Sequence, residues 1–450
     1  MSHLAQGVHR YLLAATIFVV ACGVGIVSVS SLGLVSIAVG VSIWLIWLIF
    51  RNWHFGLYTV AVILPFEDLL VLSPVASVAK IVMGLTLASA SLQLLRNPEL
   101  VTRTVSSLKT EAAVAFGLFT AWSFASTIWS ADVAATVQRT VSFLGGFLLM
   151  LLTSMLTESQ LRRMWGLLAI SSGISVLATL LASSWTSSGR FSTGGLDPND
   201  FAGLLVIAMA VFLFGGLATP VSISTLIPTS LGVFLSGSRT GIVAVLATVT
   251  LSLFVGGKRR RRLLSVFIAA VVAIAAVGLV SYSQPTLVAD LVSRYSSLAN
   301  LREERTWAGR LDLWHAAARL IEERPITGVG AGSFPSVCEQ YSVQCTVINS
   351  VRPGGAVAHN MYLSVAAELG LVGLFLFLWV HWSVFRCVFP LRRSNRLAVG
   401  VLLGCAAFGV MGQTLTWEYA KIGFLLYGSA LALSYADKQK KYGLPIPQES

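Results

Sequence analysis

Long apolar runs separated by short polar stretches make up almost the whole chain. The runs are about 20 residues long, the length that an α-helix needs to cross a bilayer. Because lipid cannot satisfy open backbone groups, the pattern predicts an all-α, polytopic transmembrane helical bundle of 12–14 spans. The runs lie at 11–29, 32–50, 55–72, 75–95, 111–130, 136–156, 164–183, 200–217, 220–236, 239–256, 263–283, 360–385, 397–413 and 419–435.

Composition agrees with a membrane protein. Of the 450 residues, 56% are hydrophobic and 11% are charged, where soluble domains have about 25% charged residues. The first apolar run, from Tyr11 to about Ser28, is expected to be a membrane span and not a cleaved signal peptide. No internal repeat is visible, so the inverted repeats of many transporters are not expected.

One long polar segment, from about Gln284 to Ala358, interrupts the apolar runs. It holds seven basic and seven acidic residues, and it is longer than a simple connection between helices. Within it, the stretch Arg310–Arg324 predicts a helix that ends at Pro325 and lies across the outer mouth of the bundle. Its apolar face is expected to consist of Leu311, Trp314, Ala318 and Ile321.

The glycine-rich stretch Pro325–Gly332 follows this helix. It lacks the Lys-Ser/Thr pair of a phosphate-binding loop, so we interpret it as a tight turn. These features divide the chain into four parts: an N-terminal transmembrane bundle (1–185), spans with outer arginine loops (186–283), the long outer loop (284–358), and C-terminal spans with a cytoplasmic tail (359–450).

The distribution of positive charge predicts the orientation. The run Lys258–Arg262 is cytoplasmic under the positive-inside rule, and counting spans outward from it places the other basic clusters on the same side. Both termini are then cytoplasmic, and the net charge of +12 reflects topology and not nucleic-acid binding, since basic patches interleaved with aromatic residues are missing. The clusters are Arg51, Arg96/Arg103/Lys109, Arg162/Arg163, Arg386/Arg392/Arg393/Arg396 and Lys438/Lys440/Lys441.

The same count places three polar segments on the outer, periplasmic face. They are the loop Ser184–Asn199, the turn Ser236–Gly241 and the long loop. Cys338 and Cys345 lie together in the long loop, where either a disulfide or two free thiols fits the sequence.

Four cationic or titratable side chains are expected to converge on this face: Arg190, Arg239, Arg310 and His359. Arginine recognises phosphate through two parallel hydrogen bonds, and histidine moves protons near neutral pH. Together they fit a substrate with a diphosphate and a hydroxyl nucleophile.

Each of the four also has a structural interpretation. Arg239 would be at the membrane interface, Arg190 solvated in a loop, Arg310 paired with Asp312, and His359 bonded to a carbonyl at a helix end.

Residues after His359 extend this site into the predicted span. Tyr362 is expected one turn below His359, while Asn360, Ser364 and Glu368 share a neighbouring face. An acid inside a span is functional or paired, and for Glu368 we favour a polar network.

The segment Asp197–Asp200 fits a helix cap, and Glu67, Asp68 and Lys80 fit a buried ion pair. The sequence has no cluster with metal-ligand spacing, so we expect a metal-free site in which arginines supply the positive charge.

These motifs resemble the O-antigen ligase/polymerase superfamily of bacterial polytopic membrane glycosyltransferases. The resemblance covers about 185–380 and rests on the order and spacing of several short motifs. They are Asn199/Phe201/Ala202, Ser238/Arg239/Gly241, Gly309/Arg310/Trp314, Pro325/Ile326/Gly328/Val329/Gly330, His359/Asn360/Tyr362/Leu363 and Glu368/Gly370/Gly373.

The resemblance implies a GT-C-like transferase of the inner membrane, without a cofactor. It would move a glycan from undecaprenyl diphosphate to a hydroxyl on the periplasmic face; in ligases the acceptor is a sugar of the lipid A core. It also implies that Arg239, Arg310 and His359 are catalytic. Arg190, Asn199, Asn360, Tyr362, Trp314 and Glu368 are expected to bind substrate.

Several alternatives remain open at this point. His359 can be a general base or a diphosphate ligand. The short Ser184–Asn199 loop favours a ligase, because polymerases tend to have two large outer loops. A polymerase, a protein O-oligosaccharyltransferase or a flippase of lipid-linked glycans also fits the pattern.

Overall fold

The computed structural model describes residues 31–71, 77–182, 190–193, 196–217, 225–255, 305–351 and 354–442. Within them the elements are helices, apart from an isolated antiparallel bridge between Val71 and Ser77, which confirms the all-α prediction. The α-helices are α2 (Ser31–Arg51), α3 (His54–Ile63), α4 (Val78–Leu94), α5 (Pro98–Leu108), α6 (Glu111–Ala125), α7 (Val133–Ser154), α8 (Glu158–Leu181), α9 (Pro198–Phe214), α11 (Leu226–Leu235), α12 (Arg239–Phe254), α15 (Arg305–Glu323), α16 (Phe334–Val337), α17 (Val343–Val351), α18 (Met361–Val388), α19 (Arg396–Met411) and α20 (Lys421–Tyr442). The short 3-10 helices are η1 (Leu64–Leu70), η2 (Ser126–Ile128), η4 (Cys338–Gln340) and η5 (Phe389–Arg393).

The lengths of these helices revise the expected number of spans. Four stretches among the described residues are long and apolar enough to cross a membrane: Glu111–Ile128, Val133–Ser154, Glu158–Leu181 and Met361–Arg393. Helices α4 and α5, bent by 118°, would form a fifth span together. The apolar helices α9, α11, α12 and α19 have only 10–17 residues. The predicted runs 11–29 and 263–283 lie outside the described residues; the other runs coincide with helices, but not all with full-length spans.

Polar side chains between the apolar runs fix where helices begin. Thr157 and Gln160 form a capping box at the start of α8. Asp132, Asn360 and Asn395 accept backbone N–H groups at the starts of α7, α18 and α19. A residue next to such a cap therefore has a fixed place at the end of its helix.

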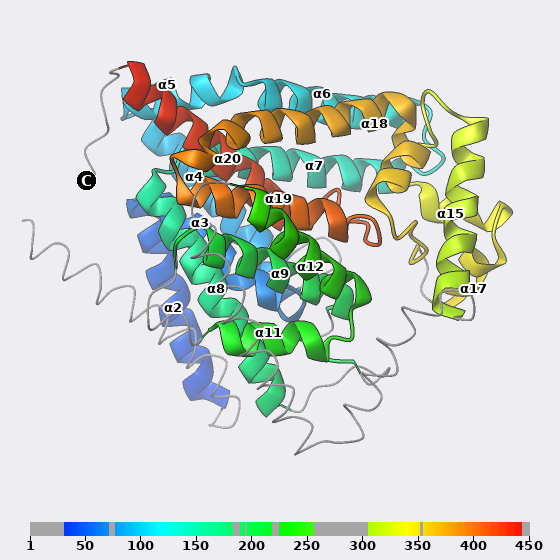
Figure 1. The fold of residues 1–450 in the computed structure, drawn as a ribbon, viewed down its shortest axis with the longest axis horizontal. Coiled ribbons are helices and arrows are strands. Elements are labelled where there is room, and N and C mark those ends of the chain that lie inside the picture. The colour runs from blue at the N-terminus through cyan, green and yellow to red at the C-terminus, as the bar shows by residue number, and fades with distance from the viewer. Residues whose placement is uncertain are drawn as a thin grey trace, which may run out of the picture.

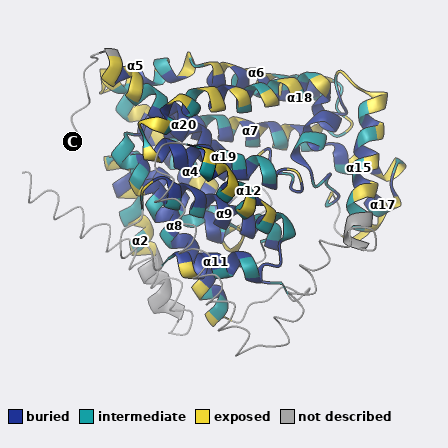
Figure 2. Ribbon diagram, in the orientation of Figure 1, coloured by how far each residue is buried: buried dark blue, intermediate teal, exposed yellow. Residues whose placement is uncertain are grey.

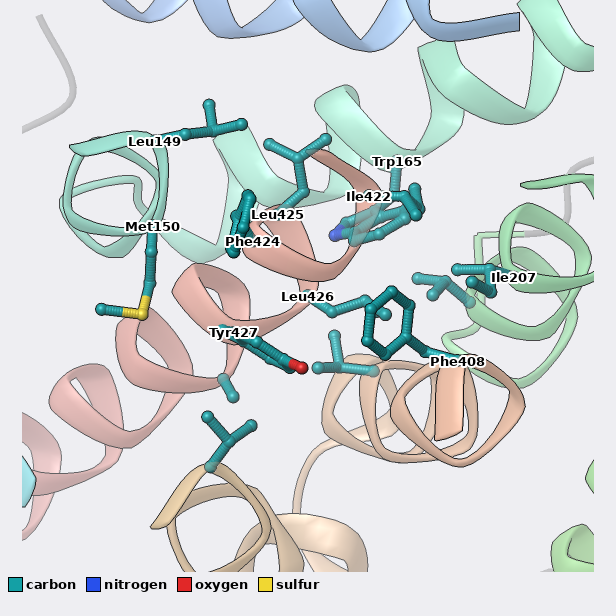
Figure 3. Close-up of a cluster of buried hydrophobic side chains, with 14 of the residues drawn as sticks. Leu149, Met150, Trp165, Ile207, Phe408, Ile422, Phe424, Leu425, Leu426 and Tyr427 are labelled. Atoms are coloured by element: carbon teal, nitrogen blue, oxygen red, sulfur yellow. The ribbon is translucent and has the colours of Figure 1, made fainter. Parts of the chain in front are cut away.

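The long helices lie side by side around an aromatic core. Helix α6 packs against α7 and α18, α20 packs against α7, and α19 packs against α9 (Figure 1). Buried residues fill the interior, and exposed residues line the outer edges of α6 and α18 (Figure 2). Trp165, Phe408 and Tyr427 meet in the core (Figure 3). The indole of Trp165 donates to Ser429 Oγ at 3.0 Å, which satisfies its polar atom.

Helices α15 and α17 lie at one end of the bundle, beyond the ends of α6, α7 and α18 (Figure 1). The predicted helix in the long loop is therefore present, but its apolar face was predicted wrongly. Leu311 is 43% exposed, because α15 turns another face toward α18 and the segment Phe334–Cys345. That buried face consists of Leu313, Ala316, Ala317 and Leu320; of the four predicted residues, Ile321 packs against it.

Helix α18 is broken at Gly370, which has φ +69°. The glycine-rich turn of the long loop fills the break: Val329 N and Gly330 N donate to the carbonyls of Ala367 and Glu368 at 3.1 and 2.8 Å, and Leu371 N donates to Pro325 O at 2.7 Å. A Cβ at Gly370 would collide with the turn. The turn is thus a structural partner of α18.

The basic clusters in the described residues gather at the opposite end of the bundle. Arg103 donates to Met155 O at 2.8 Å and Arg386 pairs with Glu111 at 3.4 Å. Arg162 pairs with Glu158 at 2.8 Å. The Arg103 contact joins α5 to the C-terminal end of α7, the Arg162–Glu158 pair lies within the first turns of α8, and the Arg386–Glu111 pair links α18 to α6.

Candidate active site

The expected site residues lie at the starts of three helices and on α15. Asp197 caps α9, Ser238 caps α12 with Arg239 as its first residue, and His359 directly precedes the α18 cap, Asn360. Helix N-termini carry partial positive charge and free N–H groups, so this end of the bundle favours an anion.

A chain of hydrogen bonds joins the Arg190 loop to the turn before α12. Arg190 Nε donates to Ser236 O at 2.9 Å, and its Nη2 donates to Asn199 Oδ1 at 2.9 Å. Asn199 in turn donates through N and Nδ2 to Asp197 Oδ1 at 2.7 and 2.9 Å. The predicted residues Arg190 and Asn199 are therefore direct neighbours.

The turn that carries Arg239 is tightly built. Ser238 Oγ accepts from Gly241 N at 3.2 Å, and Ser238 N donates to Ser236 Oγ at 3.2 Å. A Cβ on Gly241 would lie 3.1 Å from Ala202 of α9, tighter than ordinary van der Waals contact. The glycine therefore lets α12 approach α9 closely and fixes the start of α12.

Arg310 lies within electrostatic reach of Arg239 and His359, although long stretches of sequence separate the three. Burial lowers the pKa of Arg310, the Asp197 carboxylate raises it, and Arg239 lowers it further. Trp314, one turn along α15, is half-buried. The structure thus brings together the three residues expected to be catalytic, beside a carboxylate.

His359 has an unusual backbone and a shifted pKa. Its φ is +48°, a conformation that side chains other than glycine adopt rarely. Burial lowers its pKa to about 4, with a further lowering by Arg310 and an opposing effect of Asp197. The imidazole is therefore neutral at pH 7 and able to accept a proton.

Asn360 and Tyr362 make structural contacts. Asn360 Oδ1 accepts from Tyr362 N and Leu363 N at 3.0 and 3.1 Å, as the α18 cap. The Tyr362 hydroxyl donates to Gly409 O of α19 at 3.3 Å, and its ring packs toward Phe377 and His381. Neither set of contacts reaches His359, which lies outside the helix because of its positive φ.

Glu368 is 4% exposed and lies beneath the long loop. Its carboxylate accepts from Gly332 N at 2.6 Å and Phe334 N at 3.4 Å. These bonds tie α18 to the long loop that carries Arg310. Cys338 and Cys345 form a disulfide in the same loop, and both are fully buried.

Other polar residues near the site were not expected from the sequence. Arg139 of α7 pairs with Glu418 at 3.0 Å, and Glu67 pairs with Lys421. A lone arginine inside the predicted span 136–156 was the only sequence signal for the first pair. Among the described residues, no group of three or more His, Cys, Asp or Glu side chains is placed to hold a metal.

Comparisons with known proteins bear on the same region. Residues 224–378, which include Arg239, Arg310 and His359, match a family described as O-antigen ligase. A solved chain from a structure described as "Structural coordination of polymerization and crosslinking by a peptidoglycan synthase complex" is similar to 73% of this chain over 98% of its own length, with 16% identity and a TM-score of 0.41. No curated protein matches significantly.

Proposed function

We propose that the chain is a periplasmic-face glycosyltransferase of the bacterial inner membrane, a proposal supported by the match of residues 224–378 to a family described as O-antigen ligase. It moves an O-antigen polysaccharide from undecaprenyl diphosphate to a sugar hydroxyl of the lipid A core. The reaction is inverting and needs no metal.

One observation carries this proposal: Arg310 lies within electrostatic reach of both Arg239 and His359, and the three residues come from separate segments. The positive charges of Arg239 and Arg310 repel one another, so a bound anion would stabilise the arrangement. A diphosphate beside the membrane is such an anion, and the adjoining apolar helices provide a surface for a polyprenyl chain.

In the proposed reaction, Arg239 and Arg310 bind the diphosphate, with Arg190 assisting. The bond between the anomeric carbon and the diphosphate oxygen breaks, and its electron pair leaves with the diphosphate. The acceptor hydroxyl forms the new bond from the opposite face, and its proton passes to His359. The arginines stabilise the negative charge that develops on the leaving group.

The geometry also explains why His359 would act only with donor bound. In the free protein its pKa is about 4, which makes it a weak base. The negative charge of a bound diphosphate counteracts Arg310 and raises the pKa toward neutrality. Donor binding therefore prepares the base for the acceptor.

Transfer by the purified protein tests the proposal. The reaction contains an undecaprenyl-diphosphate glycan, a lipid A-core acceptor and a chelator, with Arg239→Ala and His359→Ala as test variants. Arg162→Ala is the matched control, because Arg162 lies at the opposite end of the bundle. We expect a modified core in the wild type and the control, and none in the test variants.

Other products would identify the alternatives. A longer glycan without core modification indicates a polymerase, and a glycosylated protein acceptor indicates an oligosaccharyltransferase. Movement of labelled donor between leaflets without either product would contradict the enzyme proposal and favour a flippase.

A further inference from the structure

The turn Gly412–Ala420 between α19 and α20 lies outside every motif considered above, yet it contacts three of the helices that carry the site. It is mostly buried: Leu415, Trp417 and Glu418 are 3%, 6% and 3% exposed. A buried connection needs partners for its polar groups, and here those partners lie next to site residues.

The first contact fixes the start of α18. Gly412 O accepts from Met361 N at 2.8 Å, two residues after His359. A Cβ on Gly412 would collide with the Met361 side chain as it is placed, so glycine allows this close approach without a shift of the methionine. The bond occupies a backbone N–H at the helix start, where no intrahelical partner exists.

The second contact reaches α12. Thr414 Oγ1 donates to Thr240 Oγ1 at 2.8 Å. Thr240 directly follows Arg239, so the bond restrains the backbone from which the Arg239 side chain extends.

The third contact reaches α9. The Trp417 indole donates to Asp200 Oδ1 at 2.7 Å, and the ring stacks on Phe408 at 5.6 Å. Asp200 directly follows Asn199, the residue that binds Arg190. The contact therefore holds the α9 end of the hydrogen-bonded chain in place.

Two further bonds anchor the turn itself. Glu418 Oε1 accepts from Arg139 at 3.0 Å and from Ser364 Oγ at 2.9 Å. The Arg139 guanidinium also lies 4.1 Å from the Tyr419 ring centroid. The turn is thus attached to α7 and α18 as well as to the segments that it contacts next to the site.

We propose that this turn is a positioning platform, and that Thr414 and Trp417 are positioning residues that set Arg239 and Asn199 relative to His359. The kinetic part of this inference rests on the proposed transferase function. Catalysis depends on placing the diphosphate cations and the base together, and a displacement of about 1 Å can reduce the rate about 100-fold.

The kinetic experiment uses nearly isosteric changes in the full-length protein. Thr414→Val and Thr240→Val each remove one hydroxyl of the pair, and Trp417→Phe removes an indole N–H. We expect each to lower kcat about tenfold, while the Thr414→Val/Thr240→Val double variant loses no more than either single variant, as for two residues that act through one bond.

Trp165→Phe is the matched control, because it also removes a buried indole hydrogen bond but lies in the core away from these contacts. It should lower thermal stability as much as Trp417→Phe and leave kcat unchanged. Additive losses in the threonine pair, or equal kcat losses in Trp417→Phe and Trp165→Phe, would overturn the platform.

Hydrogen exchange tests the platform without any substrate. In Thr414→Val and Trp417→Phe we expect faster exchange at the first turns of α12 and α9, respectively, with other helices unchanged. Unchanged exchange would reject the platform even if transfer is confirmed. Absence of transfer by the wild type, together with the expected exchange pattern, would reject the proposed reaction and leave the platform supported.

Discussion

The two ends of the bundle are both rich in arginine and hold it in different ways. At the basic end, Arg386 pairs with the Glu111 carboxylate and Arg103 donates to the Met155 carbonyl, so each has a partner within the protein. At the other end, Arg310 interacts electrostatically with Arg239, Asp197 and His359. The difference indicates that charge at the first end organises the fold, whereas charge at the second is suited to a ligand.

Replacing arginines at the two ends should have the largest effect on transfer, and it tests directly whether the ends differ in function. Arg310→Lys keeps the charge but loses the planar fork that binds phosphate oxygens, and Arg239→Ala loses the charge. We expect transfer to fall about 1,000-fold in Arg239→Ala and less in Arg310→Lys, measured as kcat/KM for the donor.

Arg386→Ala at the basic end is the matched control, since its pair is exposed. It should change neither the activation free energy of transfer nor the free energy of unfolding by more than about 0.5 kcal/mol. Equal losses at both ends would mean that the two sets of arginines are not functionally distinct.

The buried pair between Arg139 and Glu418 gives the next largest effect. Arg139→Met would leave the 3% exposed Glu418 without its counter-charge, and we expect the free energy of unfolding to fall by about 3 kcal/mol. Adding Glu418→Gln should recover part of the loss. The partly exposed i,i+4 pair Glu158–Arg162 provides the contrast, because its removal should cost at most about 0.5 kcal/mol.

The sequence predicted the main features of both ends. The positive-inside pattern and the apolar runs depend on local composition, so the basic clusters and the helix positions followed directly. The convergence of Arg239, Arg310 and His359 was also expected, because topology placed them on one face.

What the sequence did not predict depends on tertiary contacts. The break in α18 forms because the turn at Pro325 supplies hydrogen bonds from elsewhere in the chain. The positive φ of His359, which directly precedes the α18 cap, is not indicated by any periodicity. The turn Gly412–Ala420 carries no motif, since its role depends on partners far away in sequence.

Two glycine substitutions compare the effect of an added methyl group on stability in different parts of the bundle. Gly370→Ala places a side chain at φ +69° against the Pro325 turn, and should cost about 2 kcal/mol of unfolding free energy. A Cβ added at Gly166, inside α8, would meet no atom within 4 Å, so Gly166→Ala should stabilise the protein by about 0.5 kcal/mol. Thermal or denaturant unfolding in detergent measures both, and equal effects would contradict the specific role of the break.

The pH dependence of transfer distinguishes the two roles of His359. In the free protein its pKa is about 4, so kcat/KM should stay nearly constant from pH 7 to pH 5 if His359 is the base. Bound diphosphate raises the pKa in the complex, so kcat should begin to fall at a higher pH than kcat/KM. If His359 instead binds the diphosphate as a cation, lowering the pH would protonate it and strengthen donor binding, and the KM for the donor would fall as the pH drops. A His359→Gln variant, which cannot be protonated in this range, should lose transfer if His359 is the base, and should lose the pH dependence of the donor KM if His359 binds as a cation. The parameter that changes as the pH is lowered therefore assigns the role. A fall in kcat identifies His359 as the base of the reaction. A fall in the KM for the donor identifies it as a cation that binds the diphosphate together with the arginines.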